Sequence, residues 1–282
     1  MPRTVWLNGA FMPEDEAQLP IFDRGLLFAD AVYEGLGVLD GHIIDFAHHM
    51  ARLRRSLSEL DMAEPMSEAA LHAALTDLIT RNTMTEGFLY LHITRGAHDR
   101  DYLYPAGLTP NIFAFTQDTH DAPTLTLASA PDIRWARRDI KTTNLLGQVM
   151  AKEIARKAGA DEALMVDREG FVTECGAMSF FMIKDGALYA RPLLGELLPG
   201  ITRQTMLRVA QAEHLVIHEE RYTLEDTFTA DEAFATGASS YIQPVTQIDG
   251  HTIGSGAPGP VTQSLRTAYL AAIRADFAAR AD

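Results

Sequence analysis

The sequence predicts an α+β fold with two domains. Two kinds of pattern support this prediction. The dipeptides Asn8-Gly9, Asp40-Gly41, Asp185-Gly186 and Asp249-Gly250 each lie between apolar or alternating runs, as in tight β-hairpins. Other segments repeat apolar residues at helical spacing. Because most predicted strands are joined by hairpins rather than by helices, we expect antiparallel strands and segregated helices instead of a doubly wound parallel sheet.

The predicted elements follow in chain order. Hairpins are expected in the segments 5–12, 37–44, 163–174, 182–189 and 246–253, and further strands at 88–94, 111–116, 124–129, 215–221 and 232–236. Helices are expected from Phe46 to Leu60 and at 67–81, 145–158, 201–213 and 261–280. Asp45 and Ser67 precede the first two helices and could cap them, and Gly159 could end the third.

A polar stretch, 116–124, is the best candidate for a linker. It divides the chain into two parts of ordinary domain size. We therefore predict an N-terminal α+β domain at 1–118, a linker at 119–124 and a C-terminal domain at 125–282.

Composition limits the classes of partner. The 282 residues carry a formal net charge of −14, which disfavours nucleic acid and anionic membranes. One cysteine excludes an intramolecular disulfide, and the N-terminal segment lacks the apolar region of a secretory signal. We expect a cytoplasmic protein. No glycine-rich dinucleotide or P-loop motif and no Cys/His metal spacing is present, so we expect no metal site.

Lysine is rare in this chain, which has only Lys141, Lys152, Lys157 and Lys184. Two of these lie on a charged helix face and one precedes a hairpin turn, where solvent exposure is expected. Lys141 follows a possible strand, "RRDI", and precedes a predicted helix. A lysine held at such a corner could attack a carbonyl if it were desolvated. By position alone, a solvated loop lysine remains the simpler interpretation.

Three further stretches carry candidate binding groups. Glu174 ends a hairpin strand and could pair with a buried cation or a protonated heterocycle. Ile201 and Thr202 follow Pro199-Gly200 at a helix start, which could bind a phosphate. Arg52 lies on a helix face and could close such a phosphate site. Each residue, taken alone, also fits an ordinary structural role.

Together these stretches resemble one family along nearly the whole chain. The motifs are "FDRGLLFADAVYEGLGVLDG" (22–41), "HHMARLRRS", "TRGAHDRDYLYP" (94–105), "DIRWARRDIKTTNLLGQVMAKEIA" (132–155), "VTE", "PGITR" and "ATGASSYIQPV" (235–245). In this order they resemble the fold-type IV aminotransferases that use pyridoxal 5'-phosphate (PLP), above all the D-amino-acid transaminases. The resemblance implies a smaller N-terminal α/β domain and a larger, β-barrel-like C-terminal domain with helices.

The resemblance also assigns roles to single residues. Lys141 would be the catalytic Schiff-base lysine. The expected remaining cofactor contacts are Glu174 at the pyridine nitrogen and, at the phosphate, Arg52, Ile201, Thr202, Gly237 and Ala238. Tyr33, Arg100, Tyr102 and Ser239 would bind the substrate. In this family the loop with Arg100 is expected to reach across from a second subunit, which implies a homodimer.

The implied reaction is transamination between a D-amino acid and a 2-oxo acid, either pyruvate or 2-oxoglutarate. Tyr102 stands where the best-known D-transaminases carry histidine, and a phenol brings no positive charge. An (R)-selective amine transaminase is therefore an alternative, as is a branched-chain L-amino-acid transaminase. A PLP lyase of the aminodeoxychorismate type is less favoured. A non-catalytic α+β binding module is the alternative from another class.

Overall fold

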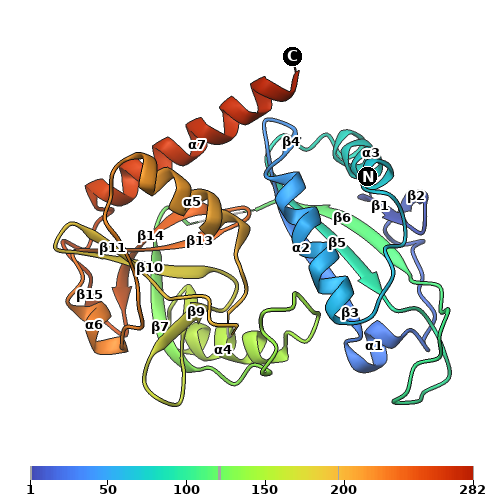
Figure 1. The fold of residues 1–282 in the computed structure, drawn as a ribbon, viewed down its shortest axis with the longest axis horizontal. Coiled ribbons are helices and arrows are strands. Elements are labelled where there is room, and N and C mark those ends of the chain that lie inside the picture. The colour runs from blue at the N-terminus through green and yellow to red at the C-terminus, as the bar shows by residue number, and fades with distance from the viewer. Residues whose placement is uncertain (1, 120–121, 196, 282) are drawn as a thin grey trace. The chain divides into compact units, whose positions relative to one another are not determined.

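The structure is a computed structural model that describes residues 2–119, 122–195 and 197–281. The chain forms two compact units (Figure 1). One consists of Met1–His120 with Ile140–Asn144, and the other of Asp121–Asp139 with Leu145–Asp282. The segment that contains Lys141 therefore packs with the first unit, although it follows the predicted linker. Residues 120 and 121 of that linker lie outside the described residues, and its extent stays a prediction.

The first unit is built on a six-stranded antiparallel sheet. Its order is β2-β1-β6-β5-β3-β4, and its strands are β1 (Thr4–Leu7), β2 (Ala10–Pro13), β3 (Ala31–Leu39), β4 (His42–Ile43), β5 (Gly87–Thr94) and β6 (Ile112–Gln117). Its helices are α1 (Arg24–Phe28), α2 (Phe46–Glu59) and α3 (Glu68–Arg81). The predicted hairpin turns at Asn8-Gly9 and Asp40-Gly41 join β1 to β2 and β3 to β4, which confirms both.

Alternation along β5 separates the two faces of this sheet. Leu89, Leu91 and Ile93 are buried in a core shared with α2 and α3, while Phe88, Tyr90 and His92 are half-buried on the opposite face. The core therefore lies on the helix side of the sheet. The other face is aromatic, and Tyr33 of β3 belongs to it, with its ring centroid 5.4 Å from that of Tyr90.

The helix starts of the first unit were predicted with mixed success. Ser67 caps α3 and accepts a hydrogen bond from the Ala70 N–H, as expected. Asp45 precedes α2, but its side chain makes no capping hydrogen bond, so that prediction was wrong. The reason is its left-handed backbone, with φ of 50° and ψ of 33°, instead of the extended conformation that aims a side chain at the first turn.

The second unit is a nine-stranded mixed sheet with four helices. The strands are β7 (Leu125–Pro131), β8 (Glu162–Val166), β9 (Val172–Cys175), β10 (Ser179–Lys184), β11 (Ala187–Ala190), β12 (Ile217–Glu219), β13 (Glu232–Gly237), β14 (Tyr241–Ile248) and β15 (His251–Thr252). The helices are α4 (Leu146–Lys157), α5 (Ile201–Ala212), α6 (Leu224–Phe228) and α7 (Pro260–Ala281). The main order is β12-β11-β10-β13-β14-β7-β8-β9, and β15 pairs with β14.

This sheet curls, as a barrel-like domain requires. Its last strand, β9, returns to contact β10, and the Cys175 N–H donates to the Met178 carbonyl at 2.8 Å. Three of the pairings are parallel: β7 with β8, β7 with β14, and β11 with β12. Helix α4 is the crossover between β7 and β8. Thus the α+β prediction is confirmed, with a parallel component that hairpin counting did not reveal.

Candidate active site

Lys141 lies in an irregular segment that is pinned to the first unit. Its carbonyl accepts from the Tyr33 N–H at 3.0 Å, its own N–H donates to Ser56 Oγ at 3.3 Å, and the next residue, Thr142, bridges to Val32. The predicted strand "RRDI" does not form; residues 138–140 make a turn instead. The sequence pattern failed there because the segment is ordered by contacts with β3 and α2 rather than by a ladder of its own.

The ammonium group of Lys141 has no carboxylate partner among the residues that the structure describes. Its Nζ lies 4.2 Å from the ring centroid of Tyr33, and the residue is half-buried. A lysine held at its backbone, with its amine free of ion pairs, suits covalent attachment to a carbonyl group. The two predicted site residues Tyr33 and Lys141 are thus brought together.

Two other lysines are engaged elsewhere. Lys152 was expected to be solvated, but its Nζ pairs at 2.7 Å with the buried carboxylate of Glu162, so that expectation was only half right. Lys184 donates to Thr229 Oγ1 at 2.9 Å beside its hairpin. Both contacts are structural, since the first neutralises a buried charge and the second joins the hairpin to the C-terminal end of α6.

Arg52 is buried on α2 and paired with Glu34 of β3. Arg52 Nε donates to Oε1 at 2.9 Å and Nη2 donates to Oε2 at 2.6 Å, while His49 Nδ1 lies 2.7 Å from Oε2. Burial alone would raise the pKa of Glu34, but the charge and hydrogen bonds of Arg52, with those of His49, hold it at about 2. The pair fixes the plane of the guanidinium group. Glu34 was not predicted from the sequence, although its place between Tyr33 and Gly35 in an apolar strand marks it as a buried charge.

Arg100 and Tyr102 stand on an exposed loop of the first unit. The guanidinium carbon of Arg100 lies 5.3 Å from the Tyr102 ring centroid and 5.4 Å from that of Phe28. Two of the four residues predicted to bind the substrate are therefore neighbours. Tyr102 is 77% exposed, so its ring lacks cover from this chain.

Glu174 is buried on β9 of the second unit and faces Arg134. Arg134 Nη1 donates to Glu174 Oε2 at 2.6 Å, and the same guanidinium binds Asp132 through Nε at 3.0 Å and Nη2 at 2.8 Å. Burial alone would lower the pKa of Arg134, but the two carboxylates outweigh it and raise that pKa. Burial would likewise raise the pKa of Asp132, yet Arg134, Thr173 and Arg138 hold it at about 2. A guanidinium fixed in this way favours an ionised Glu174.

The start of α5 offers uncapped backbone N–H groups. Gly200 is its N-cap and makes no side-chain capping bond, so Ile201 and Thr202 begin the helix without one. A Cβ on Gly200 would lie 3.0 Å from Ser179 Oγ, and Thr236 is the cross-strand partner of Ser179. Thr236 Oγ1 is buried without a hydrogen-bond partner among the described residues.

Gly237, Ala238 and Ser239 follow Thr236 directly, at the end of β13 and in the turn to β14. An unpartnered hydroxyl, uncapped helix N–H groups and a small-residue turn in one unit fit the donor set that a phosphate requires. The residues present in the second unit therefore fit a phosphorylated cofactor.

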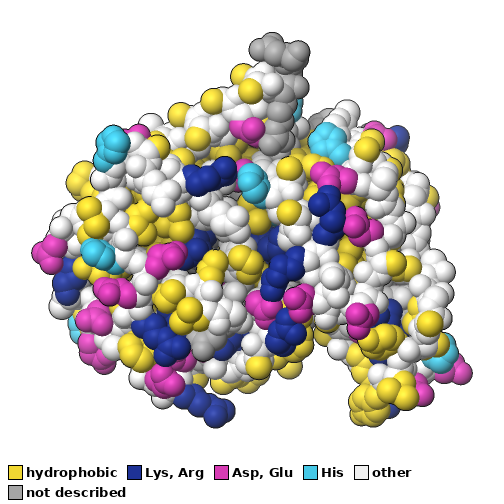
Figure 2. Space-filling view, in the orientation of Figure 1, with side chains coloured by type: hydrophobic (Ala, Val, Ile, Leu, Met, Phe, Trp, Pro, Cys, Tyr) yellow, Lys and Arg dark blue, Asp and Glu magenta, His cyan; other side chains and the backbone are white. Residues whose placement is uncertain are grey.

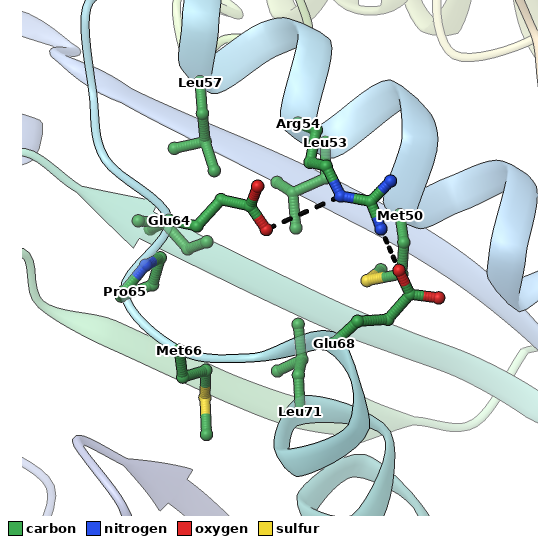
Figure 3. Close-up of a pocket in the computed structure, with 10 residues that line it drawn as sticks. Met50, Leu53, Arg54, Leu57, Glu64, Pro65, Met66, Glu68 and Leu71 are labelled. Carbon is green, nitrogen blue, oxygen red and sulfur yellow. Dashed lines mark hydrogen bonds and ion pairs between the residues drawn. The ribbon is translucent and has the colours of Figure 1, made fainter.

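The pocket drawn in Figure 3 is a different feature. It lies in the first unit among α2, α3 and their connection, and Arg54 at its rim pairs with Glu64 at 3.6 Å and with Glu68. Its lining is otherwise apolar, and it has room for about one water molecule. Since it contains none of the predicted site residues, we regard it as a packing gap. The described residues include no helix long and apolar enough to span a bilayer and no acidic, histidine and cysteine cluster suited to a metal.

Comparison with known proteins decides the family. A family model, Amino-transferase class IV, matches residues 31–248. The chain belongs to the class IV aminotransferases. A D-alanine aminotransferase of Bacillus licheniformis is 38% identical over 97% of this chain and 98% of its own. One from Staphylococcus haemolyticus is 35% identical over 94% of this chain and 96% of its own.

Solved structures support the same assignment. A branched-chain amino acid aminotransferase from a T.th. strain, complexed with N-(5'-phosphopyridoxyl)-L-glutamate, matches with a TM-score of 0.89 and 28% identity, over 97% of this chain and 94% of its own. That of Thermoproteus uzoniensis with norvaline matches with a TM-score of 0.85 and 28% identity, over 95% and 93%. The predicted fold-type IV architecture is confirmed. Aminotransferases of this class use PLP, so this aminotransferase is a PLP enzyme.

Proposed function

We propose that this aminotransferase transfers the amino group of a D-amino acid to a 2-oxo acid, pyruvate or 2-oxoglutarate. The observation that carries the proposal is the Lys141 amine, unpaired with any carboxylate of the described chain and adjacent to Tyr33. The D-alanine aminotransferases that the chain resembles over nearly its whole length support the choice of donor.

Bound PLP supplies an electron sink that stabilises negative charge at the substrate Cα. Lys141 Nζ is the amine that would carry the cofactor covalently. Once free, it would take the proton from the substrate Cα and hold it for return. Its backbone hydrogen bonds to Tyr33 and Ser56 keep the amine in one place for both tasks.

The remaining cofactor contacts divide between ring and phosphate. Glu174, charged and held by Arg134, would keep the proton on the pyridine nitrogen. Arg52 and the first N–H groups of α5, at Ile201 and Thr202, would bind the phosphate. Gly237 and Ala238 would add backbone donors from the turn that follows β13.

Substrate recognition would depend on a carboxylate site. Arg100 would pair with the α-carboxylate in a pocket that also contains Tyr33, and Tyr102 would donate a hydrogen bond to the same group. Ser239 would contact the rest of the substrate. Fixing the carboxylate fixes which face of the Cα meets Lys141, and so decides between D and L substrates. We propose that this loop acts in the site of a second copy, in a cytoplasmic homodimer.

One alternative has an observation of its own. The solved relatives of similar shape include branched-chain amino acid aminotransferases, which favours an L-amino acid with a branched side chain. An (R)-selective amine transaminase is the other, because Tyr102 brings no positive charge to the carboxylate site.

Steady-state kinetics with three donors test the proposal. We expect kcat/KM for D-alanine with 2-oxoglutarate to exceed that for L-leucine by roughly 100-fold or more, and that for (R)-1-phenylethylamine by about 10-fold or more, because a site built around a carboxylate rejects molecules that lack it or present it wrongly. Exclusive use of L-leucine would replace the proposal by the branched-chain alternative, and preference for the amine by the other.

The assay needs a matched pair of lysine variants. Lys141→Ala should fold, lose the visible absorption of bound PLP and have no measurable turnover, because its amine is removed. Lys184→Ala removes a lysine at a hairpin and should keep wild-type activity. Turnover by Lys141→Ala would show that another amine carries the cofactor.

A further inference from the structure

Arg24 is a buried cation that donates hydrogen bonds to the backbone of an exposed loop. The loop consists of residues 97–107, all of which are exposed, and it carries Arg100 and Tyr102. Arg24 is 3% exposed at the start of α1. Its Nη1 donates to the Asp101 carbonyl at 2.7 Å and to the Leu103 carbonyl at 3.4 Å, and Nη2 donates to the Tyr102 carbonyl at 3.4 Å. The carbonyl groups of an exposed loop can accept hydrogen bonds from water. Hydrogen bonds from Arg24 are therefore needed only to hold the loop backbone in one conformation.

The neck of the loop is closed close to Arg24. The backbone N–H of Arg24 donates to the Gly96 carbonyl at 2.9 Å, and Asp23 forms an isolated β-bridge with Ala97. Gly96 has φ of 105°, and a Cβ there would collide with the Thr109 carbonyl oxygen. The two ends of the loop are therefore fixed to each other and to α1, which leaves the tip as the part that needs a separate support.

Charge balance shows that Arg24 is not required for burying Asp30. Arg24 Nε donates to Asp30 Oδ2 at 2.8 Å, and Arg95 Nε donates to the same oxygen at 2.7 Å. Two guanidinium groups thus share one carboxylate. Arg95 alone would neutralise it, and Arg95 also donates to the Leu60 carbonyl at 2.6 Å. The guanidinium group of Arg24 is therefore not needed to neutralise Asp30, and its other hydrogen bonds go to the carbonyls of the loop.

A second contact couples Arg24 to Arg100 itself. The guanidinium carbon of Arg24 lies 4.7 Å from the Phe28 ring centroid, and that of Arg100 lies 5.4 Å from the same centroid. Phe28 is therefore a ring that both cations contact. Arg24 fixes the loop backbone and, with α1, the aromatic surface on which Arg100 rests.

We propose that Arg24 is the positioning residue for the carboxylate-binding loop, holding Arg100 and Tyr102 where a substrate carboxylate reaches them. This inference rests on the proposed function, in which that loop recognises the α-carboxylate. Arg24 contacts neither substrate nor cofactor in this role; it acts through the carbonyls of residues 101–103 and through Phe28.

The test compares Arg24→Met with wild type as holoenzyme. Because Asp30 keeps Arg95, the variant leaves no unpaired buried carboxylate and is expected to fold. KM for D-alanine should rise roughly 10-fold or more, with kcat changed less than about twofold, since a small displacement of a binding group is costly. The kcat/KM for (R)-1-phenylethylamine, which has no carboxylate, should stay within about twofold. Amide hydrogen exchange at Leu103, whose N–H donates to Asp101 Oδ1 at 3.1 Å within the loop, should accelerate about 10-fold.

Three further variants make the result specific. Arg24→Lys keeps a cation beside Asp30 but not the forked geometry, so it should restore part of the KM. Arg54→Met is the same change at a surface ion pair of the same unit and should alter neither readout. Arg100→Ala removes the group that Arg24 is proposed to position, and it should raise the KM for D-alanine without changing the amine.

The outcomes separate the inference from the proposed function. If Arg100→Ala raises the KM for D-alanine but Arg24→Met does not, the inference is wrong and the function stands. Equal losses for D-alanine and the amine in Arg24→Met would indicate a merely structural role. If Arg100→Ala leaves the KM for D-alanine unchanged, the carboxylate assignment of the proposed function fails. Even then, unchanged hydrogen exchange in Arg24→Met would by itself overturn the positioning role of Arg24.

Discussion

Two buried carboxylates of this protein, Glu34 and Glu174, are each paired with an arginine from a distant part of the chain. Glu34 of β3 meets Arg52 and His49 of α2, and Glu174 of β9 meets Arg134. One member of each pair, Arg52 or Glu174, is a residue that was predicted to contact the cofactor. A buried guanidinium or carboxylate without its partner would be unstable, so the pairs fix side-chain positions rather than add much stability. The partners were invisible in the sequence because they lie 18 and 40 positions away.

At the residue scale, His92 provides a test of pH dependence. Burial lowers its pKa to about 4, and Tyr90 OH lies 3.0 Å from its Nδ1. In the unfolded chain histidine titrates near 6.5. As pH falls from 6.5 toward 4, the unfolded chain therefore binds a proton that the folded chain does not, and stability should decrease by about 2–3 kcal/mol in total from this residue.

Urea unfolding at pH 6.5, 5.5 and 4.5 measures that loss. His92→Gln keeps a hydrogen-bond acceptor but does not titrate. Most of the loss of unfolding free energy that is attributed to His92 should therefore be absent in this variant. The folded pKa values of Glu34 and Asp132 are about 2, so both carboxylates lose most of their contribution to stability below this pH range. Identical pH profiles for variant and wild type would remove His92 as the cause.

At the scale of elements, turn chemistry was the most informative part of the sequence. The four Asx-Gly hairpins and the β8–β9 hairpin all form, and helices α3 to α5 and α7 lie within one or two residues of their predicted bounds, as does α2. Predicted strand 215–221 shortens to Ile217–Glu219, an edge strand that has only β11 as a neighbour. Local patterns succeed where the local backbone determines the element. They fail at Asp45 and at 137–140, where a neighbouring element decides the backbone.

The start of helix α7 is capped by a carboxylate from the sheet. Glu232 of β13 accepts from the N–H groups of Val261 and Thr262 at 2.9 and 2.8 Å and from Thr262 Oγ1 at 2.7 Å. It therefore caps a helix that is 29 residues away in the chain. Glu232→Ala should destabilise the protein by about 2 kcal/mol, because three donors lose their acceptor, and Glu232→Gln should destabilise it less.

Chemical unfolding measures this effect, with Glu220→Gln as an exposed control that should change stability by less than about 0.5 kcal/mol. A loss of less than about 0.5 kcal/mol in Glu232→Ala would mean that solvent or another group satisfies the start of α7 equally well.

At the scale of the whole molecule, each of the two units presents a group of exposed apolar side chains. Leu103 is 79% exposed beside Tyr102, and Figure 2 shows apolar side chains at the outer tip of this loop, at the lower right of the view. Helix α4 of the second unit also presents a stripe of exposed apolar residues, Leu146, Val149, Met150 and Ile154. Exposed apolar residues spaced three or four positions apart lie on one face of a helix, and such a face is typical of a contact surface.

Sedimentation tests the proposed homodimer. Wild-type protein should sediment as a dimer at micromolar concentration, and Leu103→Glu should weaken the dimer by roughly 10-fold or more, because it places a charge in a desolvated contact. Val216→Glu replaces an apolar residue of the second unit that is 58% exposed and belongs neither to this loop nor to α4, and it should leave the dimer intact. A wild-type monomer at all concentrations would contradict the proposal.

The sequence by itself determined the hairpins, the long helices and the family, since each is carried by local pattern or by motif order, and the resemblance to that family singles out Lys141 as the proposed Schiff-base lysine. Only the tertiary structure decided that Lys141 packs with the first unit, that Glu34 and Arg134 hold Arg52 and Glu174, and that Arg24 binds the carbonyls of the exposed loop 97–107. These depend on which distant elements become neighbours. A buried charge is paired with a residue that folding brings next to it, and the spacing of residues in the sequence does not predict which residue that is.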